Sequence, residues 1–563
     1  MAILSQSTAS FSFSFSFVST RTDSTRLTRF PSRVTFRARS PPRRHALVSS
    51  RLNSSRSPDA GGSLSPDNGS GDVAYQLHHD FSPRRRRRGS PVFVTLPVNS
   101  VGREGRVARP KAMMFSLKAL ATAGVEGVVI EIWWGLVEKN KPRVYDWRGY
   151  EELVAMACKC GLKVRAVLAF HQHGTGPDDP NCLSPLCRIP LPLWVLDEIQ
   201  KDIELAYCDR FGRRNIEYIS LGCDILPVLH GRSPIQAYAD FMRNFRDTFG
   251  SLLGVIITGV QIGMGPGGEL RYPSFSSQEP NLAWPHELGE FQCYDKYMLA
   301  SLNASARNIG KREWGNGGPF GSGSLMQNPE HTDFFKNDGG SWDTPYGKFF
   351  LEWYSDMLLL HGERICREAE TIFRGSEVHI SAKLAAIHWH YVTQSHPSEL
   401  TAGYYNTSNR DGYLPIARMF SKYGFSMCCS CFEMQDAVMQ KINPDGSPEG
   451  FLRQLLLAAR LCDISLEGQN FSTNLDDGAF TQVLKMSKFY SDGIEKRSFS
   501  FNFVRMDKRL FESRNWDRFT RFVRQMSNGN IFRARLNSVR DVRLKTTPVV
   551  AAVGLLYHLY QHS

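Results

Sequence analysis

The sequence predicts an α/β protein built as a closed (β/α)8 barrel, a TIM barrel, with long loops at its C-terminal face. Short apolar runs of strand length alternate with amphipathic helical stretches from residue 91 onward. Eight of the runs are strong strand candidates, the number that closes such a barrel. Polar and aromatic residues also gather where the runs end. An open, doubly wound sheet would show the same alternation and is the alternative fold.

The predicted strands and helices follow one another along residues 91–530. The apolar runs predict strands at residues 92–97, 127–134, 163–171, 255–265, 378–389, 425–434, 463–470 and 498–506. Helical periodicity predicts helices at residues 110–124, 147–161, 234–249, 348–373, 448–461 and 479–490. A further apolar run, residues 216–224, lies in the long excursion between the third and fourth of these strands.

The candidate functional side chains lie at the ends of the predicted strands. These strands finish in Glu131, His171, Glu269, His388, Glu433, Gln469 with Asn470, and Arg505. In a barrel, the C-terminal ends of the strands form the active face, where side chains from separate strands converge. Indole and imidazole rings beside carboxylates suit a sugar, because its apolar face stacks on rings and its hydroxyls take hydrogen bonds.

The positive charge of the chain belongs to its N-terminal leader. Residues 1–90 hold fifteen Arg, no Lys and five Asp, so they carry ten of the thirteen net positive charges. Residues 1–58 are rich in Arg and Ser with one acid, Asp23, which is typical of an organelle transit peptide and favours a plastid over a mitochondrion. Residues 59–90 are predicted as a disordered basic linker, and residues 531–563 as a C-terminal extension. The run from Arg84 to Arg88 is also compatible with a nucleic-acid patch.

Neither a metal nor a dinucleotide is predicted. The twelve cysteines show no zinc-ligand spacing, and most are expected to be buried free thiols, with Cys182 and Cys187 as candidates for redox activity. Gly263 to Gly268 fits the spacing of a dinucleotide loop, but Pro273 and the lack of a following helical pattern argue against one. These glycines are better explained as positions where the backbone passes close to a ligand and presents Glu269 to it.

Several segments closely resemble plant β-amylases. They are Ile189-Pro-Leu-Pro192, Gly268-Glu-Leu-Arg-Tyr-Pro-Ser274, Gly347-Lys-Phe-Phe-Leu-Glu-Trp-Tyr354, Ile387-His-Trp389, Glu399-Leu-Thr-Ala-Gly-Tyr-Tyr-Asn406 and Arg410-Asp-Gly-Tyr413. The resemblance extends from about residue 91 to about residue 525. It implies a (β/α)8 barrel that hydrolyses α-1,4-glucans from their non-reducing ends and releases maltose with inversion. It implies no cofactor.

The resemblance places the two catalytic positions at Glu269 and Gln469. Inverting hydrolysis needs one carboxyl group as proton donor and a second as general base for the attacking water. Glu269 occupies the donor position in the motif Gly-Glu-Leu-Arg-Tyr-Pro. The family's base lies in Gly-Glu-Asn-Ala-Leu, which here reads Gly468-Gln-Asn-Phe-Ser472, so Gln469 replaces it. Glutamine can hold a water but has no useful basicity. Glu467, on the same strand face, is the one candidate substitute.

The family's substrate contacts fall on eight further residues, and some of them depart from the family pattern. They are Glu131, His171, Lys383, His388, Ser430, Glu433, Asn470 and Arg505. Glu131 stands where the family has Asp, Ser430 where it has Thr, and His390 where it has Trp. The family's mobile lid is replaced by the Pro-rich segment from His173 to Cys182, in which Asp178 or Asp179 could supply the lid carboxylate.

These observations predict a β-amylase-like protein of the chloroplast stroma that has lost most or all hydrolytic activity. It would regulate starch breakdown by binding an α-1,4-glucan, a maltooligosaccharide or a protein partner, without nucleic acid or membrane. One alternative is an active β-amylase that uses an unconventional base. The other, from a different class, is a nucleic-acid-associated regulator that acts through Arg84 to Arg88.

Overall fold

The computed structural model describes residues 89–174, 188–275, 287–472, 475–490 and 499–528. All of them belong to one compact unit, Phe81–Ser563. The predicted transit peptide (residues 1–58), nearly all of the predicted linker (59–90) and the predicted C-terminal extension (531–563) lie outside the described residues. The same holds for Arg84 to Arg88 and for Cys182 and Cys187.

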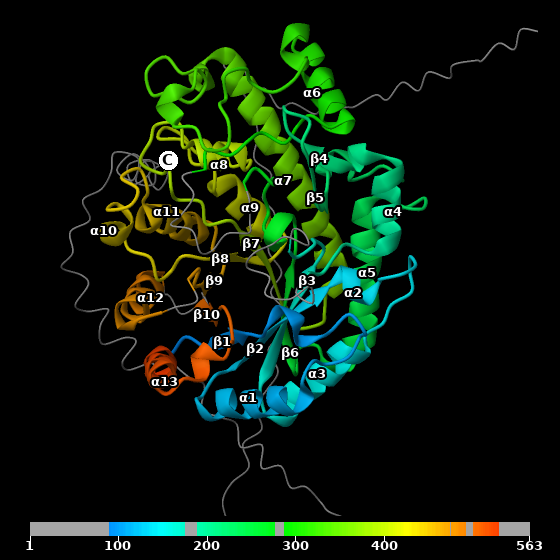
Figure 1. Cartoon of the computed structure of the whole chain (residues 1–563), viewed down its shortest axis with the longest axis vertical. Coiled ribbons are helices and arrows are strands. Elements are labelled where there is room, and N and C mark those ends of the chain that lie inside the picture. The colour runs from blue at the N-terminus through cyan, green and yellow to red at the C-terminus, as the bar shows by residue number, and fades with distance from the viewer. Residues whose placement is uncertain (1–88, 175–187, 276–286, 473–474, 491–498, 529–563) are drawn as a thin grey trace, which may run out of the picture. The chain divides into compact units, whose positions relative to one another are not determined.

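Eight parallel strands close into a barrel, which confirms the TIM barrel and shows that the open-sheet alternative is wrong (Figure 1). The strands are β1 (Val92–Thr95), β2 (Gly127–Trp133), β3 (Lys163–Ala169), β6 (Ile257–Ile262), β7 (His379–Leu384), β8 (Phe425–Cys429), β9 (Leu466–Gln469) and β10 (Phe499–Phe503). Closure is made between the first and last strands, where Val92 of β1 aligns with Phe501 of β10. The carboxyl ends of all eight strands therefore meet at one face.

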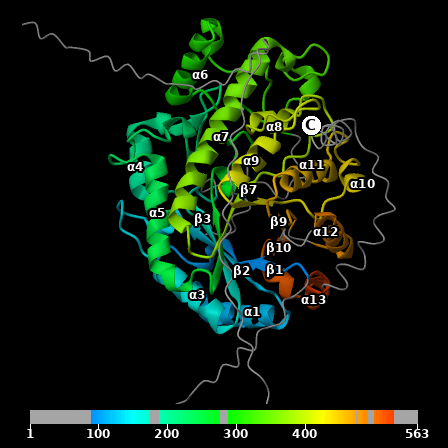
Figure 2. The ribbon, with the colours of Figure 1, turned by 180° about the vertical axis from the view of Figure 1, so that it is seen from behind.

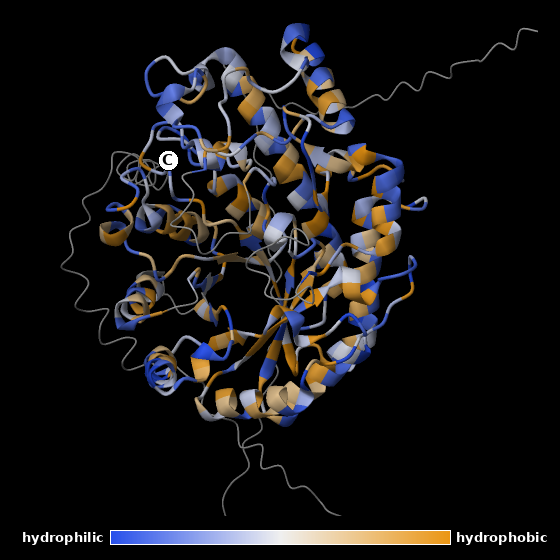
Figure 3. Cartoon of the chain, viewed as in Figure 1, coloured by the Kyte–Doolittle hydropathy of each residue, from blue (hydrophilic) through white to orange (hydrophobic). Residues whose placement is uncertain are grey.

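Helices surround this barrel, as the two opposite views show (Figures 1 and 2). They are α1 (Pro110–Thr122), α2 (Trp134–Val137), α3 (Arg148–Lys159), α4 (Leu193–Lys201), α5 (Pro234–Phe249), α6 (Lys296–Asn308), α7 (Pro345–Phe373), α8 (Pro397–Thr401), α9 (Leu414–Lys422), α10 (Asp436–Met439), α11 (Pro448–Leu461), α12 (Asp477–Tyr490) and α13 (Ser513–Ser527). The strands are largely hydrophobic and several of the surrounding helices are two-sided (Figure 3), because a helix that packs on the barrel buries one face and exposes the other.

The predicted run at residues 216–224 forms a hairpin outside the barrel. Strand β5 (Arg214–Ile219) pairs antiparallel with β4 (Ala206–Cys208), and a short 3-10 helix, Leu221–Cys223, follows it. The hairpin belongs to the excursion between β3 and β6, which are neighbours in the barrel. It therefore lies in the part of the chain that leads from one barrel strand to the next.

Most of the predicted strands run past the true strand ends. The predicted strand at residues 378–389 stops at Leu384, although Ala385, Ile387 and Trp389 beyond it are all buried. Loops at the active face are covered by other loops, so apolar residues persist after the ladder of hydrogen bonds has ended. Periodicity alone does not separate a buried strand from a buried loop.

We predict that the barrel folds without its leader. The first contact that ties the start of the described chain to the barrel is the Ser90 amide, which donates to the Met526 carbonyl of α13 at 2.8 Å. Strand β1 begins at Val92. Deleting residues 1–85 should leave a cooperative thermal transition at the melting temperature of the full chain. A large drop in melting temperature would show that the leader packs on the barrel.

Candidate active site

Glu269 is held by two cations at the end of a glycine-rich loop that follows β6. Its carboxylate lies 3.1 Å from Lys383 Nζ and 2.9 Å from Arg271 Nε. Lys383 comes from β7, and the two residues also form a backbone bridge. The sequence prediction brought Glu269 and Lys383 to one site, and the structure confirms that they are in contact. Arg271, two residues after Glu269, completes the cluster.

These cations set the ionisation of Glu269. Burial alone would raise its pKa, but Lys383 and Arg271 outweigh burial and lower the pKa below its ordinary value. Without a sugar, Glu269 is therefore a carboxylate at neutral pH. A general acid must carry its proton when the bond breaks, so Glu269 would have to gain a proton when a sugar is bound.

Gln469 ends strand β9 and is buried. Its backbone carbonyl accepts from the Phe432 amide at 3.2 Å, and its side-chain Oε1 lies 3.4 Å from Ser430 Oγ, just beyond β8. The structure thus brings together two predicted site residues from adjacent strands. The pair offers hydroxyl and amide groups that can hold a water but cannot take its proton at neutral pH.

Glu467, the candidate substitute for the base, is bound inside the barrel. It lies on β9 two residues before Gln469, and its carboxylate is 3.5 Å from Arg165 Nη1 and 3.4 Å from Asn502 Nδ2. Arg165 in turn donates to Ser500 Oγ at 2.8 Å. The carboxylate is held among these side chains, one strand repeat of about 6.6 Å from position 469. Glu467 is therefore poorly placed to replace the base.

Glu131 and Arg505, both predicted sugar contacts, are bound to each other. Arg505 donates two parallel hydrogen bonds, at 2.8 Å and 3.0 Å, to the two carboxylate oxygens of Glu131. Burial would raise the pKa of Glu131, but Arg505 outweighs it and the pKa is lowered. A bidentate pair of this kind is strong and geometrically demanding. A sugar at this end of the site would have to share or displace it.

His171 and His388 are both buried and neutral. Burial lowers the pKa of His171 to about 3 and that of His388 to about 4. His171 lies against the Trp133 ring, with 5.1 Å between ring centroids, and its Nδ1 is buried without a hydrogen-bond partner among the described residues. That nitrogen therefore keeps an unused hydrogen-bonding position at the site. His388 directs Nδ1 to the Ala386 carbonyl at 3.1 Å.

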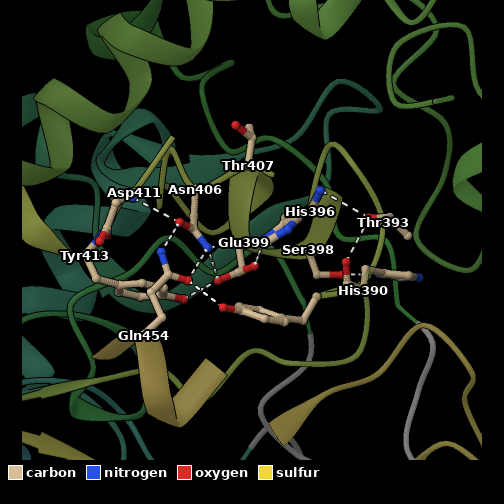
Figure 4. A network of polar contacts seen from close by, with 12 residues as sticks. His390, Thr393, His396, Ser398, Glu399, Asn406, Thr407, Asp411, Tyr413 and Gln454 are labelled. Carbon is tan, nitrogen blue, oxygen red and sulfur yellow. Dashed lines mark hydrogen bonds and ion pairs between the residues drawn. The ribbon is translucent and has the colours of Figure 1, made fainter. Parts of the chain in front are cut away.

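A polar network joins the segment that follows β7 to helix α11 (Figure 4). Glu399 accepts from His396 Nδ1 at 2.7 Å, from Asn406 Nδ2 at 3.1 Å and from the Tyr413 hydroxyl. Asn406 and Gln454 of α11 exchange hydrogen bonds at 2.8 Å and 3.1 Å. Two segments quoted above, 399–406 and 410–413, therefore meet at this network and hold the loops that carry His388.

The remaining evidence on identity comes from comparison with known proteins. Residues 93–531 match the family described as "Glycosyl hydrolase family 14". The chain belongs to glycosyl hydrolase family 14, the β-amylase family. "Beta-amylase 1, chloroplastic" of Arabidopsis thaliana is 51% identical over 445 residues, 78% of this chain and 76% of that protein. "Beta-amylase 1, chloroplastic" of Oryza sativa subsp. japonica is 47% identical, over 84% of this chain and 86% of that protein.

A solved structure from the same family supports the fold. The catalytic domain of the β-amylase from Paenibacillus polymyxa superposes with a TM-score of 0.62 at 22% identity, over 77% of this chain and 98% of that one. At this identity the likeness shows the fold alone.

Asn470, a predicted glucan contact of the β-amylase site, uses its side chain on the protein. Its amide donates to the Ser472 carbonyl at 2.9 Å and to the Val504 carbonyl, and its Oδ1 accepts from the Val504 amide at 2.8 Å. The side chain thus joins the turn after β9 to the end of β10. Asn470 therefore fixes the backbone that places Gln469 and Arg505.

Glu433, the last predicted contact, lies beneath the turn that follows Gln469. One carboxylate oxygen accepts from the amides of Phe471 and Ser472, at 2.8 Å and 2.6 Å, and the other is buried without a partner among the described residues. Burial raises the pKa of Glu433 to about 7. The carboxyl group is therefore half ionised near neutral pH.

This raised pKa predicts a stability that depends on pH. The folded chain keeps the Glu433 proton up to about pH 7, whereas the unfolded chain loses it near the ordinary value of 4.5, so stability falls as pH rises across that window. Glu433→Gln keeps the acceptor and stays neutral. From about pH 5 to about pH 8, the variant should gain on the order of 2–3 kcal/mol in free energy of unfolding relative to the parent. Equal pH profiles of urea unfolding would contradict this.

Two predicted site residues are not described by the structure, and one residue near the site was not predicted. The predicted lid carboxylates Asp178 and Asp179 lie outside the described residues, so the lid prediction stays untested. Sequence reasoning missed Glu217, whose carboxylate accepts from the Gly267 amide at 2.8 Å beside Glu269. The one available signal was an acid inside an apolar run.

Among the described residues, no group of three or more His, Cys, Asp or Glu side chains is arranged to hold a metal ion, and no helix is long and apolar enough to span a membrane.

Proposed function

We propose that this family 14 protein acts in plastid starch metabolism without efficient hydrolysis, by binding an α-1,4-glucan or a protein partner. One observation carries the proposal. The position of the general base is Gln469, and the nearest carboxylate on the same strand, Glu467, is held by Arg165 and Asn502. Loss of a general base typically costs about 10²–10⁴ in rate.

Glucan binding remains chemically supported. The site keeps an unpartnered imidazole nitrogen on His171, a Trp133 ring beside it, and the ionised cluster of Glu269, Lys383 and Arg271. Rings and fixed polar groups are what a sugar needs for stacking and hydroxyl recognition. The alternative, an active β-amylase, would need a base other than Glu467.

Calorimetric titration of the full chain with maltooligosaccharides, run beside a maltose-release assay on soluble starch, tests the proposal. Binding without turnover would support a glucan-binding regulator. Neither binding nor turnover would support action through a protein partner. Turnover at the level of active β-amylases would contradict the proposal and favour the enzyme.

The plastid is the proposed compartment. The relatives from Arabidopsis thaliana and Oryza sativa subsp. japonica are named chloroplastic, in agreement with the Arg- and Ser-rich leader. We predict that a fluorescent protein fused to residues 1–90 enters plastids. Diffuse cytosolic signal would contradict import, and nuclear signal would favour the nucleic-acid alternative that rests on Arg84 to Arg88.

A further inference from the structure

The loop that presents Glu269 is rich in glycine and has few hydrogen bonds of its own, among them those from the Gly268 amide to the Gly265 carbonyl and from the Glu269 amide to the Pro266 carbonyl, both at 3.0 Å. It runs from Gly263 to Gly268 and contains four glycines. Gly267 and Gly268 have φ values of 61° and 73°, in the left-handed region that glycine adopts without strain. Glycine also gives a free loop many other conformations. The position of Glu269 therefore depends on what holds this loop from outside.

Glu217 of β5 bonds two loops at once. Its carboxylate accepts from the Gly267 amide at 2.8 Å, and its backbone carbonyl accepts from the Gln172 amide at 2.9 Å. Gln172 follows β3 and Gly267 follows β6, which pair side by side in the barrel. Glu217 is itself buried. One residue of the excursion hairpin therefore ties together the two loops that carry His171 and Glu269.

The two loops also lie close to each other, with little room for a side chain at Gly268. A methyl group built on Gly268 would lie 3.3 Å from His171 Cε1, and one built on Gly267 would lie 3.8 Å from Glu269 Oε2. At the start of the loop, the Met264 carbonyl faces His361 Nε2 at 2.9 Å. A shift of the Gly267 peptide would therefore move the Glu269 carboxylate relative to its cations and to His171.

We propose that Glu217 is a positioning residue that holds Glu269 beside Lys383 by accepting the Gly267 amide hydrogen. This bond closes the end of the loop nearest Glu269. The inference rests on the proposed function only in that Glu269 faces the bound sugar. Glu217 acts through the length of its side chain. A side chain of equal length that accepts the same hydrogen bond should therefore hold Glu269 in the same position.

Two substitutions in the full chain separate reach from charge. Glu217→Gln keeps the length and the acceptor but loses the charge, whereas Glu217→Asp keeps the charge but is one methylene too short. Hydrogen exchange, measured by mass spectrometry on the peptide that covers residues 264–270, should be parent-like in Glu217→Gln. In Glu217→Asp it should be faster, on the order of tenfold to a hundredfold. Glu204→Asp, which shortens the partner of Arg214 at the same hairpin, is the control and should leave this peptide unchanged.

The second readout is the titration of Glu269 itself. Carboxyl carbon NMR on glutamate-labelled protein follows it, with the resonance assigned by its loss in Glu269→Gln. The midpoint should rise toward its ordinary value in Glu217→Asp, because the carboxylate moves away from Lys383 and Arg271, and should stay in Glu217→Gln. Neither readout uses a sugar, so a chain that binds no glucan would contradict the proposed function and still allow this test.

Three results would overturn the assignment. Parent-like exchange and titration in Glu217→Asp would show that the bond to Gly267 does not position Glu269. Equal disturbance in Glu217→Gln would show that charge matters rather than reach. Should Glu217→Asp not fold, Glu217→Gln still tests the assignment, because faster exchange in that variant contradicts the proposal.

Discussion

The Gln469→Glu variant is expected to release maltose measurably, yet at a rate at least about 10²-fold below that of active β-amylases. A gain is expected because a general base contributes about 10²–10⁴ in rate. A carboxylate at position 469 would also repel the charge on Glu269 and raise its pKa. That would oppose Lys383 and Arg271, which now lower it.

The shortfall is expected because other parts of the site also differ from the family. Glu131 is predicted to stand where the family has Asp, the segment from His173 to Cys182 is predicted to replace the family's lid, and Phe471, two residues after position 469, is exposed. Misplacing a substrate by about 1 Å can cost 10²-fold in rate. Groups that act as a unit do not contribute additively, so repairing one recovers only part of the deficit.

Three variants measured together make this prediction decisive. Gln469→Glu alone should show the partial gain, and adding Glu269→Gln to it should abolish that gain. Adding a family-type lid between Gln172 and Ile189 should raise the rate further. If Gln469→Glu alone reaches the turnover of active β-amylases, then the lid and Glu131 departures are neutral and Gln469 was the only lesion.

Replacing His361 is expected to cost about 3–5 kcal/mol in free energy of unfolding. His361, on α7, is buried between Asp224, whose carboxylate oxygens are both 2.9 Å from Nδ1, and the Met264 carbonyl, 2.9 Å from Nε2. Both ring nitrogens thus face acceptors, so the ring is placed to donate from both. Arg364 donates to the same Asp224 carboxylate at 3.0 Å. Removing the imidazole takes a hydrogen-bond donor from a buried carboxylate and from a buried carbonyl, and it leaves a cavity in the core.

The control for His361→Ala lies on the same helix. Glu368 pairs with Arg243 at 3.1 Å, and both side chains are partly exposed. Exposed pairs contribute about 0–1 kcal/mol, so Glu368→Ala should change the urea midpoint little. Similar midpoints for His361→Ala and Glu368→Ala would show that the buried cluster does not support the fold.

The barrel could be predicted because its signals are local. The run that contains Val92, Phe93 and Val94 reads as a strand from neighbouring residues alone, and α5 and α11 begin and end where their periodicity predicts. Strand ends were less predictable, because buried loops such as residues 385–389 remain apolar.

The contacts within the site could not be predicted, because they join residues far apart in the chain. Glu131 and Arg505 were each predicted from family motifs, but nothing in their spacing of 374 residues indicates that they bind each other. Asp224 and His361, which are 137 residues apart, gave no signal of a shared cluster. The contact of Glu217 with Gly267 could not be predicted either, because only the folded hairpin brings the two residues together.

The rate of maltose release from soluble starch by the unmodified full chain, measured against its Glu269→Gln variant, tests the central claim most directly. A barrel without a general base should release maltose at least about 10²-fold more slowly than active β-amylases, whether or not Glu269 is present. A parent rate at the level of active β-amylases that Glu269→Gln abolishes would contradict the account and show that another group takes the proton from water.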